Sequence, residues 1–483
     1  MTALTRPIEK LAEVPPSEQE AWLYELFDGP GVPTIPQMTD LFLNRFYDDP
    51  DHPGIHTPFL AHYEGRIFEW SASRWNYIPP AEVKAALWFW AKHVHYPSQN
   101  RISPYELTPA KTNDLYQGLL YSLRPLHHGP CWLTEPSSSI SDARYLVTFS
   151  NGIYDPLLDV LHPPTSEFFE PFPITTPFIR DAVCPKWLDF VSSASNNDPI
   201  WINLLQEFIG YCLLPTTELE RWGFFYGRPR AGKTLILDVL RSFRDEAASG
   251  SLELHKLAGE FAASPFLGKR LLITDETPTK IPNASVAETF LLRVIGNGRH
   301  NVSIKYRDAV DGAHIPAKVI MASNSLPRFS NVGNSLFNKL LPIEFKVSHE
   351  GNENPSIKRD ILKEKAGIAV WAMEGARRLL ERGHFVLPES SAELLRTYQL
   401  SANPLLSFVY TRCTLGPNLS CTSTDLYREY CNWCDENDLD DAKLNDVWFA
   451  RTLLGESGLG LSKVRKVIGG TKITTYQGLT ITT

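Results

Sequence analysis

The chain has 483 residues and a formal net charge of −8, with 47 lysines and arginines against 55 aspartates and glutamates. Hydrophobic residues make up 43% and charged residues 21% of the chain, as in ordinary folded proteins, so wholesale disorder is excluded. At about 100–200 residues per domain, this length predicts about three domains. The acidic balance excludes a protein that coats nucleic acid through bulk charge, although local groups of cations can still bind it.

The cysteines and the N-terminus indicate the cellular compartment. Seven cysteines, an odd number scattered over the chain, argue against a disulfide framework and for a reducing compartment. The first 28 residues carry acidic side chains where a secretory signal needs an apolar core. No run approaches the ~18 apolar residues that a membrane span needs. We therefore expect a cytoplasmic protein without a membrane partner.

The N-terminal third is predicted to mix helices and hairpins. Residues 1–40 are Pro-rich and acidic, which is typical of a loosely attached leader. Alternation of apolar and polar residues around a Glu-Gly pair predicts a hairpin at 58–75, and helical spacing predicts a helix at 81–94. Thr108-Pro109 is a typical helix start, with Thr as the cap and Pro at the first helical position.

Two further features precede the middle of the chain. Asn151-Gly152 favours a tight primed turn and predicts a second hairpin at 145–154. A pair of helices is then predicted, the first beginning after Cys184 and the second at Asp198-Pro199.

The segment from Arg221 to Phe345 has the pattern of a parallel α/β core, because short apolar strands that end in polar clusters alternate with helical stretches. The strands are expected at 222–226, 270–274 and 318–322. Beyond the core we expect a polar linker at 346–355, one or two helices at 357–383, a connector at 388–403 and a small α+β unit. That unit is predicted to contain helices at 405–412 and 423–437 and a basic hairpin at 463–482.

One motif in this core is typical of a phosphate-binding loop. Residues 227–234, GRPRAGKT, fit G-x-x-x-x-G-K-[ST] between an apolar strand and an apolar helix. Its glycines let backbone N–H groups curl around phosphates at a helix N-terminus. Lys233 is expected to bridge the β- and γ-phosphates of ATP, and the Thr234 hydroxyl to bind Mg²⁺. The predicted nucleotide-binding residues are Gly227, Arg228, Pro229, Arg230, Ala231, Gly232, Lys233 and Thr234.

Two later strands end in side chains that suit phosphate chemistry. RLLITDE ends in Asp275, placed to hold Mg²⁺ through water, and Glu276, placed to orient and deprotonate the attacking water. Either acid alone would fit a solvated strand end, but the pair downstream of a phosphate loop favours catalysis. KVIMA is followed by Ser323-Asn324, and an asparagine there can position water against the γ-phosphate. The candidate catalytic residues are therefore Lys233, Asp275, Glu276 and Asn324, and the candidate magnesium ligands are Thr234 and Asp275.

The three motifs fall within residues 227–324, and this compactness resembles superfamily 3 helicases, with LGKRLLITDE and VIMASNSLPRF as the second and third motifs. More narrowly, it resembles the phage, plasmid and poxvirus primase-helicase group. FSNGIYD at 149–155, CPKWLDFV at 184–191 and LLQEFIGYCL at 204–213 resemble the domain that precedes the helicase in that group. The segment 366–375 resembles its helical segment after the core, and LYREYCNWC and TYQGLTI resemble its winged-helix tail.

The resemblance covers roughly residues 55–483 and implies an α/β fold with a P-loop, AAA+-like ring-ATPase core. The implied parts are a leader (1–40), an N-terminal α+β helicase-associated domain (41–205), the superfamily 3 ATPase core (206–350), a helical segment (351–400) and a winged-helix DNA-binding domain (401–483).

The resemblance also implies an ATP- and Mg²⁺-dependent DNA helicase that forms a ring, typically a homo-hexamer, and moves 3′ to 5′. It would bind single-stranded and forked DNA and replicate a phage, satellite or plasmid in a bacterial cytoplasm. No primase domain is recognisable upstream, so priming would need a separate primase. Two alternatives stay open: an origin-binding replication initiator, and a DNA-stimulated ATPase switch without productive unwinding.

The sequence departs from the family where a cation serves the neighbouring subunit's ATP. Members usually carry an arginine pair just before the last core strand, whereas the segment here is LFNKL at 336–340. Lys339 offers charge without the planar, bidentate fork of arginine. Either Lys339 or nearby Arg328 acts as this cation, or hydrolysis is slow.

Two basic segments are candidate DNA-binding sites. A strand–turn–strand at 301–318, with Asp311-Gly312 at the turn, matches the hairpin that points into the channel of superfamily 3 rings; an ordinary exposed hairpin is the alternative. In the tail, cations flank Gly469-Gly470 as in a wing that binds duplex backbone, or in a wing without a DNA role. The candidates are Lys305, Arg307, His314, Lys318, Lys463, Arg465, Lys466 and Lys472.

Overall fold

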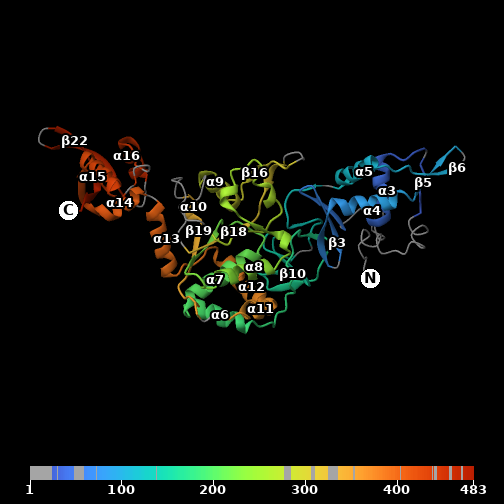
Figure 1. The fold of residues 1–483 in the computed structure, drawn as a ribbon, viewed down its shortest axis with the longest axis horizontal. Helices are drawn as coiled ribbons and strands as arrows, with labels where there is room; N and C mark the ends of the chain where they lie inside the picture. Colours follow the sequence, from blue (N-terminus) through green and yellow to red (C-terminus); the bar gives the residue numbers. More distant parts are fainter. Residues whose placement is uncertain are drawn as a thin grey trace.

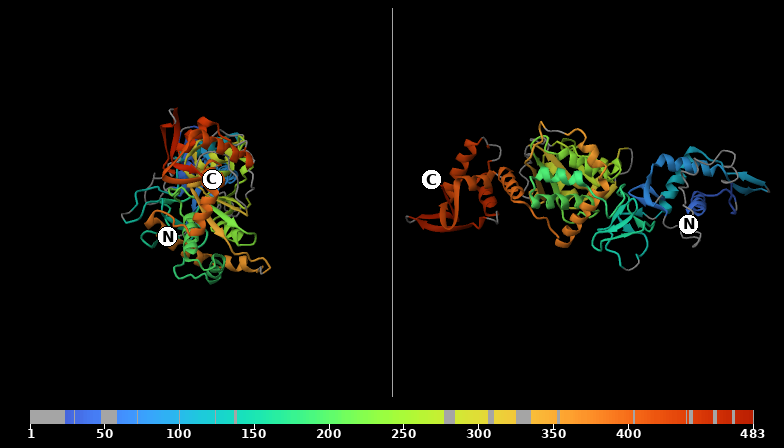
Figure 2. Two further views of the ribbon diagram at one scale, coloured as in Figure 1. Left: turned by 90° about the vertical axis from the view of Figure 1, so that its left-hand side faces the viewer. Right: turned by 90° about the horizontal axis from the view of Figure 1, so that it is seen from below.

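The computed structural model shows a mixed α/β protein in which three parts follow one another along the chain (Figures 1 and 2). An N-terminal part lies at one end, a central sheet with its helices lies in the middle, and a small C-terminal unit lies at the other end. The structure describes residues 24–29, 31–47, 59–71, 73–99, 101–123, 125–136, 139–276, 284–305, 310–324, 335–351, 354–402, 404–437, 439, 443–455, 459–468 and 471–482.

Three helices form the core of the N-terminal part: α3 (Ile35–Tyr47), α4 (Pro80–Ala91) and α5 (Pro109–Ser122). Their apolar faces pack together around Phe42 and Trp90, which are almost fully buried. Two small sheets accompany the helices, with the orders β4-β3-β2-β7 and β1-β5-β6. The strands are β1 (Glu25–Leu26), β2 (Leu60–Tyr63), β3 (Arg66–Ser71), β4 (Arg74–Ile78), β5 (Val94–Ser98), β6 (Arg101–Pro104) and β7 (Pro125–Leu126).

The predicted leader extends too far, because β1 and α3 both begin before residue 40; residues 1–23 lie outside the described part of the chain. Helix α3 begins where the Gln37 side chain accepts a hydrogen bond from the backbone N–H of Thr34 at 2.9 Å, as in a capping box. The hairpin predicted at 58–75 is confirmed as β2–β3. The helix predicted at 81–94 is confirmed as α4, which ends at Ala91. Thr108 caps α5 as predicted.

A second group of short strands leads from the N-terminal part to the centre. Strands β9 (Val147–Phe149), β10 (Gly152–Asp155) and β11 (Val160–His162) form one sheet, and β8 (Cys131–Trp132) pairs with β12 (Phe168–Phe169). The predicted hairpin is confirmed as β9–β10, but Gly152 is already paired with Phe149. Its two-residue loop is therefore Ser150-Asn151, and the Asn151 side chain instead holds both backbone groups of Phe178.

The two predicted helices follow as α6 (Pro185–Ser195) and α7 (Pro199–Leu213). Asp198 caps α7 by accepting hydrogen bonds from two backbone N–H groups of its first turn. The domain boundary predicted between residues 205 and 206 divides α7, whose two halves bury Leu204 and Phe208 in the same core. We therefore assign α7 to the central unit.

The centre of the molecule is a five-stranded parallel sheet with the order β14-β15-β18-β13-β19. The strands are β13 (Trp222–Gly227), β14 (Ser249–Ser251), β15 (Leu271–Thr274), β18 (Lys318–Ser323) and β19 (Leu340–Phe345). Strand β18 lies between β13 and β15, which precede it in the sequence. The three strands predicted from the sequence are all confirmed. Every residue of β15 and β18 is buried, as expected when helices cover both faces of a parallel sheet.

Side chains alternate between the two faces of this sheet. Phe225 and Ile343 pack in one core with α7, α8 (Lys233–Ser242) and α12 (Lys365–Arg382). Phe224 and Met321 pack in a second core with α9 (Ala284–Ile295) and α10 (Ser335–Asn338) on the opposite face (Figure 1). Short 3-10 turns at Leu254–Lys256 and Ser264–Phe266 add Leu254 and Phe266 to this second core, and a further 3-10 turn lies at Glu246–Ala248.

Between α9 and β18 in the sequence, β16 (Arg299–Val302) and β17 (Val310–His314) form a hairpin. The hairpin confirms the predicted strand–turn–strand, but the sequence predicts the turn at the wrong residues. Asp311-Gly312 lies inside β17, and the connection falls at 303–309. Pairing of β17 with β16 thus overrides the local turn preference of these two residues.

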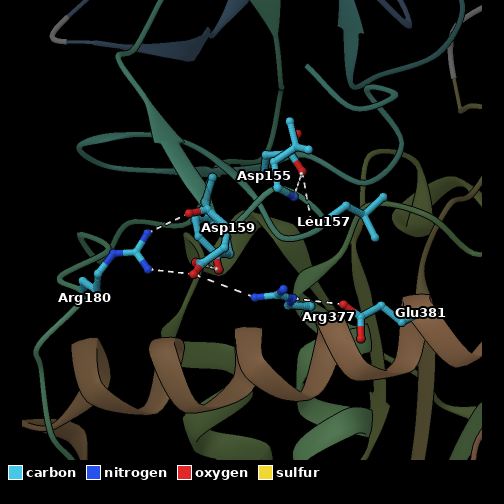
Figure 3. A network of polar contacts seen from close by, with 8 residues as sticks. Asp155, Leu157, Asp159, Arg180, Arg377 and Glu381 are labelled. Carbon is cyan, nitrogen blue, oxygen red and sulfur yellow. Dashed lines mark hydrogen bonds and ion pairs between the residues drawn. The ribbon is translucent and has the colours of Figure 1, made fainter. Parts of the chain in front are cut away.

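Three helices follow the sheet: α11 (Ile357–Leu362), α12 and α13 (Glu389–Ala402). The first two confirm the prediction of one or two helices at 357–383, whereas α13 replaces the connector predicted at 388–403. Helix α12 also holds the turn between β10 and β11 (Figure 3). There Asp159 accepts a hydrogen bond from Arg180 at 2.8 Å and lies 3.8 Å from Arg377, which also donates to Glu381.

Buried cations join the segment that follows β12 to the central unit. Arg270 donates to Glu170 at 3.0 Å, and both side chains are almost fully buried. Arg244 donates to three backbone carbonyls, one of Phe172 and two at the C-terminal end of α7. Arg244 thus satisfies two carbonyls that the end of α7 leaves without helical partners.

The C-terminal unit has the order helix, strand, helix, helix, strand, strand. Its elements are α14 (Pro404–Arg412), β20 (Cys413–Thr422), α15 (Ser423–Glu436), α16 (Asp446–Gly455), β21 (Ser462–Ile468) and β22 (Thr471–Ile481). The sheet has the order β20-β22-β21 and is antiparallel. Helices α14 and α15 and the hairpin β21–β22 confirm the prediction, which missed β20 and α16.

Among the described residues, no helix combines the length and the apolarity that a membrane crossing requires.

Candidate functional site

A pocket of about 730 Å³ opens at the carboxyl ends of three neighbouring strands. Strand β13 ends at Gly227, β15 is followed by Asp275 and Glu276, and β18 is followed by Asn324. The strands are parallel and adjacent, so these ends meet at one edge of the sheet, where ligands of open α/β sheets bind. Both acids and Asn324 line the pocket together with the loop that follows β13.

The backbone of that loop requires both glycines of the motif. Gly227 has a φ of 149°, and a Cβ atom there would lie 2.1 Å from the carbonyl oxygen of Phe345. Gly232 has a φ of 92°, and a Cβ atom there would lie 2.6 Å from the Phe190 ring. The loop therefore turns tightly into the N-terminus of α8, where backbone N–H groups lack helical partners and can bind an anion.

Segments outside the sheet hold the loop and complete the pocket. The Ser348 hydroxyl donates to the carbonyl of Pro229 at 2.9 Å, and the backbone N–H of His349 donates to the carbonyl of Arg230 at 3.1 Å. Asp189 of α6 and the side chain of His349 line the same pocket. Nε2 of His349 is buried and has no hydrogen-bond partner among the described residues.

Lys233 begins α8 and is almost fully buried. Its ammonium group donates to the carbonyls of Gly227 at 2.7 Å and Arg228 at 2.8 Å, and to Oδ1 of Asn324 at 2.7 Å. Burial lowers the pKa of Lys233 below its ordinary value. The structure thus brings together Lys233 and Asn324, which are 91 residues apart in the sequence.

The remaining predicted side chains line the pocket beside Lys233. Thr234 is exposed to it, as are Asp275 and Glu276. Both carboxylate oxygens of Asp275 accept hydrogen bonds from Arg241, at 2.8 and 2.7 Å. A hydroxyl and carboxylates are the oxygen ligands that Mg²⁺ prefers, so this donor set fits a magnesium ion.

Lys339, a candidate for the cation that would serve a neighbouring subunit's ATP, lies at the edge of the sheet opposite the pocket. Lys339 directly precedes β19 and forms an ion pair with Glu220, two residues before the start of β13. At about 3.3 Å per residue, the six-residue strand β19 separates Lys339 from the pocket edge by roughly 20 Å. Lys339 therefore does not line the pocket of its own chain. Arg328 lies outside the described residues.

The structure corrects one predicted DNA contact. Lys318 is 3% exposed, and its ammonium group donates to the carbonyls of Leu214 and Thr216 and lies 4.3 Å from the centre of the Tyr211 ring. Burial lowers its pKa from 10.5 to about 7. Lys318 therefore supports the end of α7 and is not available to DNA.

The other hairpin candidates fall in different places. Lys305 is exposed after β16, and Arg307 lies outside the described residues. His314 ends β17 and lines a second pocket, of about 1000 Å³, beside His62 and His128 of the N-terminal part.

Among the described residues, no group of three or more histidine, cysteine or acidic side chains could hold a metal ion.

The tail candidates lie on the hairpin of the C-terminal unit. Lys463 and Arg465 are exposed on β21, and the Lys463 ammonium group lies 5.4 Å from the centre of the Tyr476 ring. Lys466 and Lys472 lie on β21 and β22, and their side chains are outside the described part.

Sequence reasoning missed several residues of the site. Arg241 could have been found from its spacing, because Thr234 and Arg241 are seven residues apart and so share one face of a helix. Phe190, Asp189 and His349 carried no local signal, since α6 and the loop after β19 reach the pocket only through the tertiary fold.

Comparison with known proteins gives distant likenesses. A family described only as a family of unknown function, DUF5906, matches residues 225–335, which contain the predicted phosphate-binding loop, both acids and Asn324. No curated protein matches the chain. Two apo structures of the NrS-1 C-terminal region are similar to it, with 12% and 11% identity and TM-scores of 0.48 and 0.49; each match covers 87% of this chain and 95% of the other. The assignment of a function therefore depends on the site itself.

Proposed function

We propose that this chain is an ATP- and Mg²⁺-dependent DNA helicase of the superfamily 3 type that replicates a phage, satellite or plasmid. One observation carries the proposal: Lys233, Asp275, Glu276 and Asn324, from three separate motifs, line a single pocket at the carboxyl edge of the sheet. Phosphate transfer needs a cation, a metal-holding acid, a base and a water-positioning group in one place. The pocket contains one residue suited to each role.

Binding of ATP would use the loop and Lys233. Backbone N–H groups at the N-terminus of α8 would hold the phosphates, and the ammonium group of Lys233 would contact the β- and γ-phosphates. This ammonium group has three acceptors in the structure. Phosphate oxygens would replace some of them when ATP binds. Release from Lys233 would also leave the Asn324 side chain available to position water.

Hydrolysis would use the two acids. Thr234 and Asp275 would hold Mg²⁺, which when bound neutralises charge on the phosphates. Glu276 would accept a proton from a water molecule as the water oxygen bonds to the γ-phosphorus and the bond to the β-phosphate oxygen breaks. The products are ADP and inorganic phosphate, and Lys233 balances the negative charge on the leaving group.

The assembly and the DNA contacts of this proposal come from the family resemblance. In a homo-hexameric ring, Lys339 or Arg328 of one subunit would serve the ATP of its neighbour. The element order of the C-terminal unit is that of a winged helix, and Lys463 and Arg465 are exposed on the strand that would form its wing. Translocation 3′ to 5′ on single-stranded and forked DNA, with a separate primase, completes the proposal.

The test compares Lys233→Ala with the control Lys363→Ala, which changes an exposed lysine of the segment between α11 and α12. We expect wild type and the control to hydrolyse ATP and unwind a forked duplex, and Lys233→Ala to do neither. Unwinding by Lys233→Ala, or no ATP hydrolysis by wild type, would contradict the proposal. Footprints confined to one sequence, without unwinding, would instead favour the origin-binding initiator.

A further inference from the structure

The carboxylate of Asp275 has a dedicated partner in this structure. Both of its oxygens accept hydrogen bonds from the same terminal nitrogen, Nη2, of Arg241. The Arg241 side chain is 30% exposed and the Asp275 side chain 51% exposed, so the pair lies at the margin of the pocket and not in bulk solvent. The contact joins the end of β15 to the last turn of α8.

Arg241 is itself held by a row of alternating charges. Its Nη1 atom lies 3.5 Å from Oδ1 of Asp238, one turn earlier on α8. The other oxygen of Asp238 lies 2.6 Å from the ammonium group of Lys358 on α11. The row Asp275, Arg241, Asp238, Lys358 thus crosses from β15 over α8 to α11. Such fixed neighbours restrict the rotamers that the long arginine side chain can adopt.

The geometry of α8 brings the guanidinium back toward the pocket. Thr234, Asp238 and Arg241 have the spacing i, i+4, i+7, which places them on one helix face. Seven residues correspond to about 10.5 Å along the helix axis. Helical side chains lean toward the N-terminus of their helix, so Arg241 leans toward Thr234. This face is the one that begins at the candidate magnesium ligand.

The hydrogen bonds to Arg241 leave Asp275 able to bind a further group. An ionised carboxylate has about four acceptor positions, and the guanidinium nitrogen occupies one on each oxygen. Asp275 lines the pocket with the rest of its exposed surface. Groups that orient a metal-holding carboxylate in this way typically change metal affinity or activity by 10–100-fold when removed.

We propose that Arg241 is a positioning residue that aims Asp275 at the magnesium ion of the bound nucleotide. The inference rests on the proposed function, because it assigns a role within the same site. It differs from a purely structural role in one respect. Loss of Arg241 should weaken the contribution of Mg²⁺ to nucleotide binding while it leaves metal-free binding unchanged.

The test measures the affinity of the full chain for a fluorescent ADP analogue, once with EDTA and once with Mg²⁺. We expect wild type to bind the analogue more tightly with Mg²⁺ than with EDTA. In Arg241→Gln this increase in affinity should be about tenfold smaller, whereas the affinity in EDTA should equal that of wild type. Arg241→Lys should recover most of the gain, because a single nitrogen of Arg241 makes the contact. Arg377→Gln, which removes a surface arginine paired with Asp159 and Glu381, is the matched control and should behave as wild type.

The possible failures are distinguishable. An equal gain with Mg²⁺ in wild type and Arg241→Gln would overturn the role of Arg241 and leave the proposed function standing. A parallel loss of affinity in EDTA and in Mg²⁺ would overturn it too, since it indicates a structural role. If wild type binds no nucleotide under either condition, the proposed function fails and this inference fails with it.

Discussion

Replacement of Lys318 by methionine tests whether a buried lysine at the start of β18 is neutral in the folded protein. The side chain is 3% exposed, and burial lowers its pKa to about 7, with Arg270 and Arg244 acting in the same direction. In the unfolded chain its pKa returns to 10.5. Between these two values the unfolded chain binds a proton that the folded protein does not.

The sign and size of the effect follow from this difference. Stability rises with pH wherever the unfolded state binds more protons, by about 1.4 kcal/mol per pH unit for one group. The penalty for a charged Lys318 is therefore fully present below pH 7 and is relieved as the pH rises toward 10.5. From pH 6 to pH 9 the group should raise the free energy of unfolding of wild type by roughly 2–3 kcal/mol. Methionine has no such dependence and leaves the carbonyls of Leu214 and Thr216 without this donor.

The assay is urea unfolding of wild type and Lys318→Met at pH 6, 7, 8 and 9, followed by tryptophan fluorescence. As the pH rises, the free energy of unfolding of wild type should increase relative to that of Lys318→Met. For Lys363→Met, at an exposed position, the difference from wild type should stay constant. Parallel curves for wild type and Lys318→Met would refute the reasoning, because Lys318 would then hold its proton equally in both states. Affinity for single-stranded DNA should not change, since the ammonium group is buried.

Two further substitutions test the packing around the site. Gly232→Ala should reduce nucleotide affinity more than tenfold, because it forces a Cβ atom to 2.6 Å from the Phe190 ring at a φ of 92°; Gly383→Ala, at a φ of 78° with open space around it, should cost only about 1 kcal/mol of stability and leave affinity unchanged. Glu170→Leu leaves Arg270 buried without its charged partner and should cost about 3–5 kcal/mol in the free energy of unfolding. The double variant Glu170→Leu/Arg270→Met should be more stable than that single variant, and a less stable double variant would contradict this account of the ion pair.

Much of the central unit could be predicted from local sequence. The strands at 222–226, 270–274 and 318–322 are apolar because helices cover both faces of the sheet, and the two glycines of the phosphate loop are fixed by backbone geometry. The C-terminal hairpin β21–β22 and the helical character of residues 357–383 are also visible as patterns. These features depend on neighbours in the sequence, so periodicity and turn residues suffice to reveal them.

The features that escaped prediction depend on distant segments. The sequence predicts Lys318 as a DNA contact, and nothing local contradicts this, because its partners, the carbonyls of Leu214 and Thr216, lie more than 100 residues earlier in the chain. Asp311-Gly312 has the composition of a turn, but pairing with β16 extends the strand through it. The spacing of Arg241 from Thr234 indicates a shared helix face, but its partner Asp275 follows β15, 34 residues further along the chain. The partner in such a long-range contact leaves no local pattern to recognise.

The most direct test of the central claim is the rate of ATP hydrolysis by Glu276→Gln in the presence of Mg²⁺ and single-stranded DNA, together with its affinity for ATP. Because Glu276 lines the pocket beside Asp275 and is assigned as the base, the variant should bind ATP as tightly as wild type and hydrolyse it at least about 100 times more slowly. An unchanged rate of hydrolysis would contradict the account.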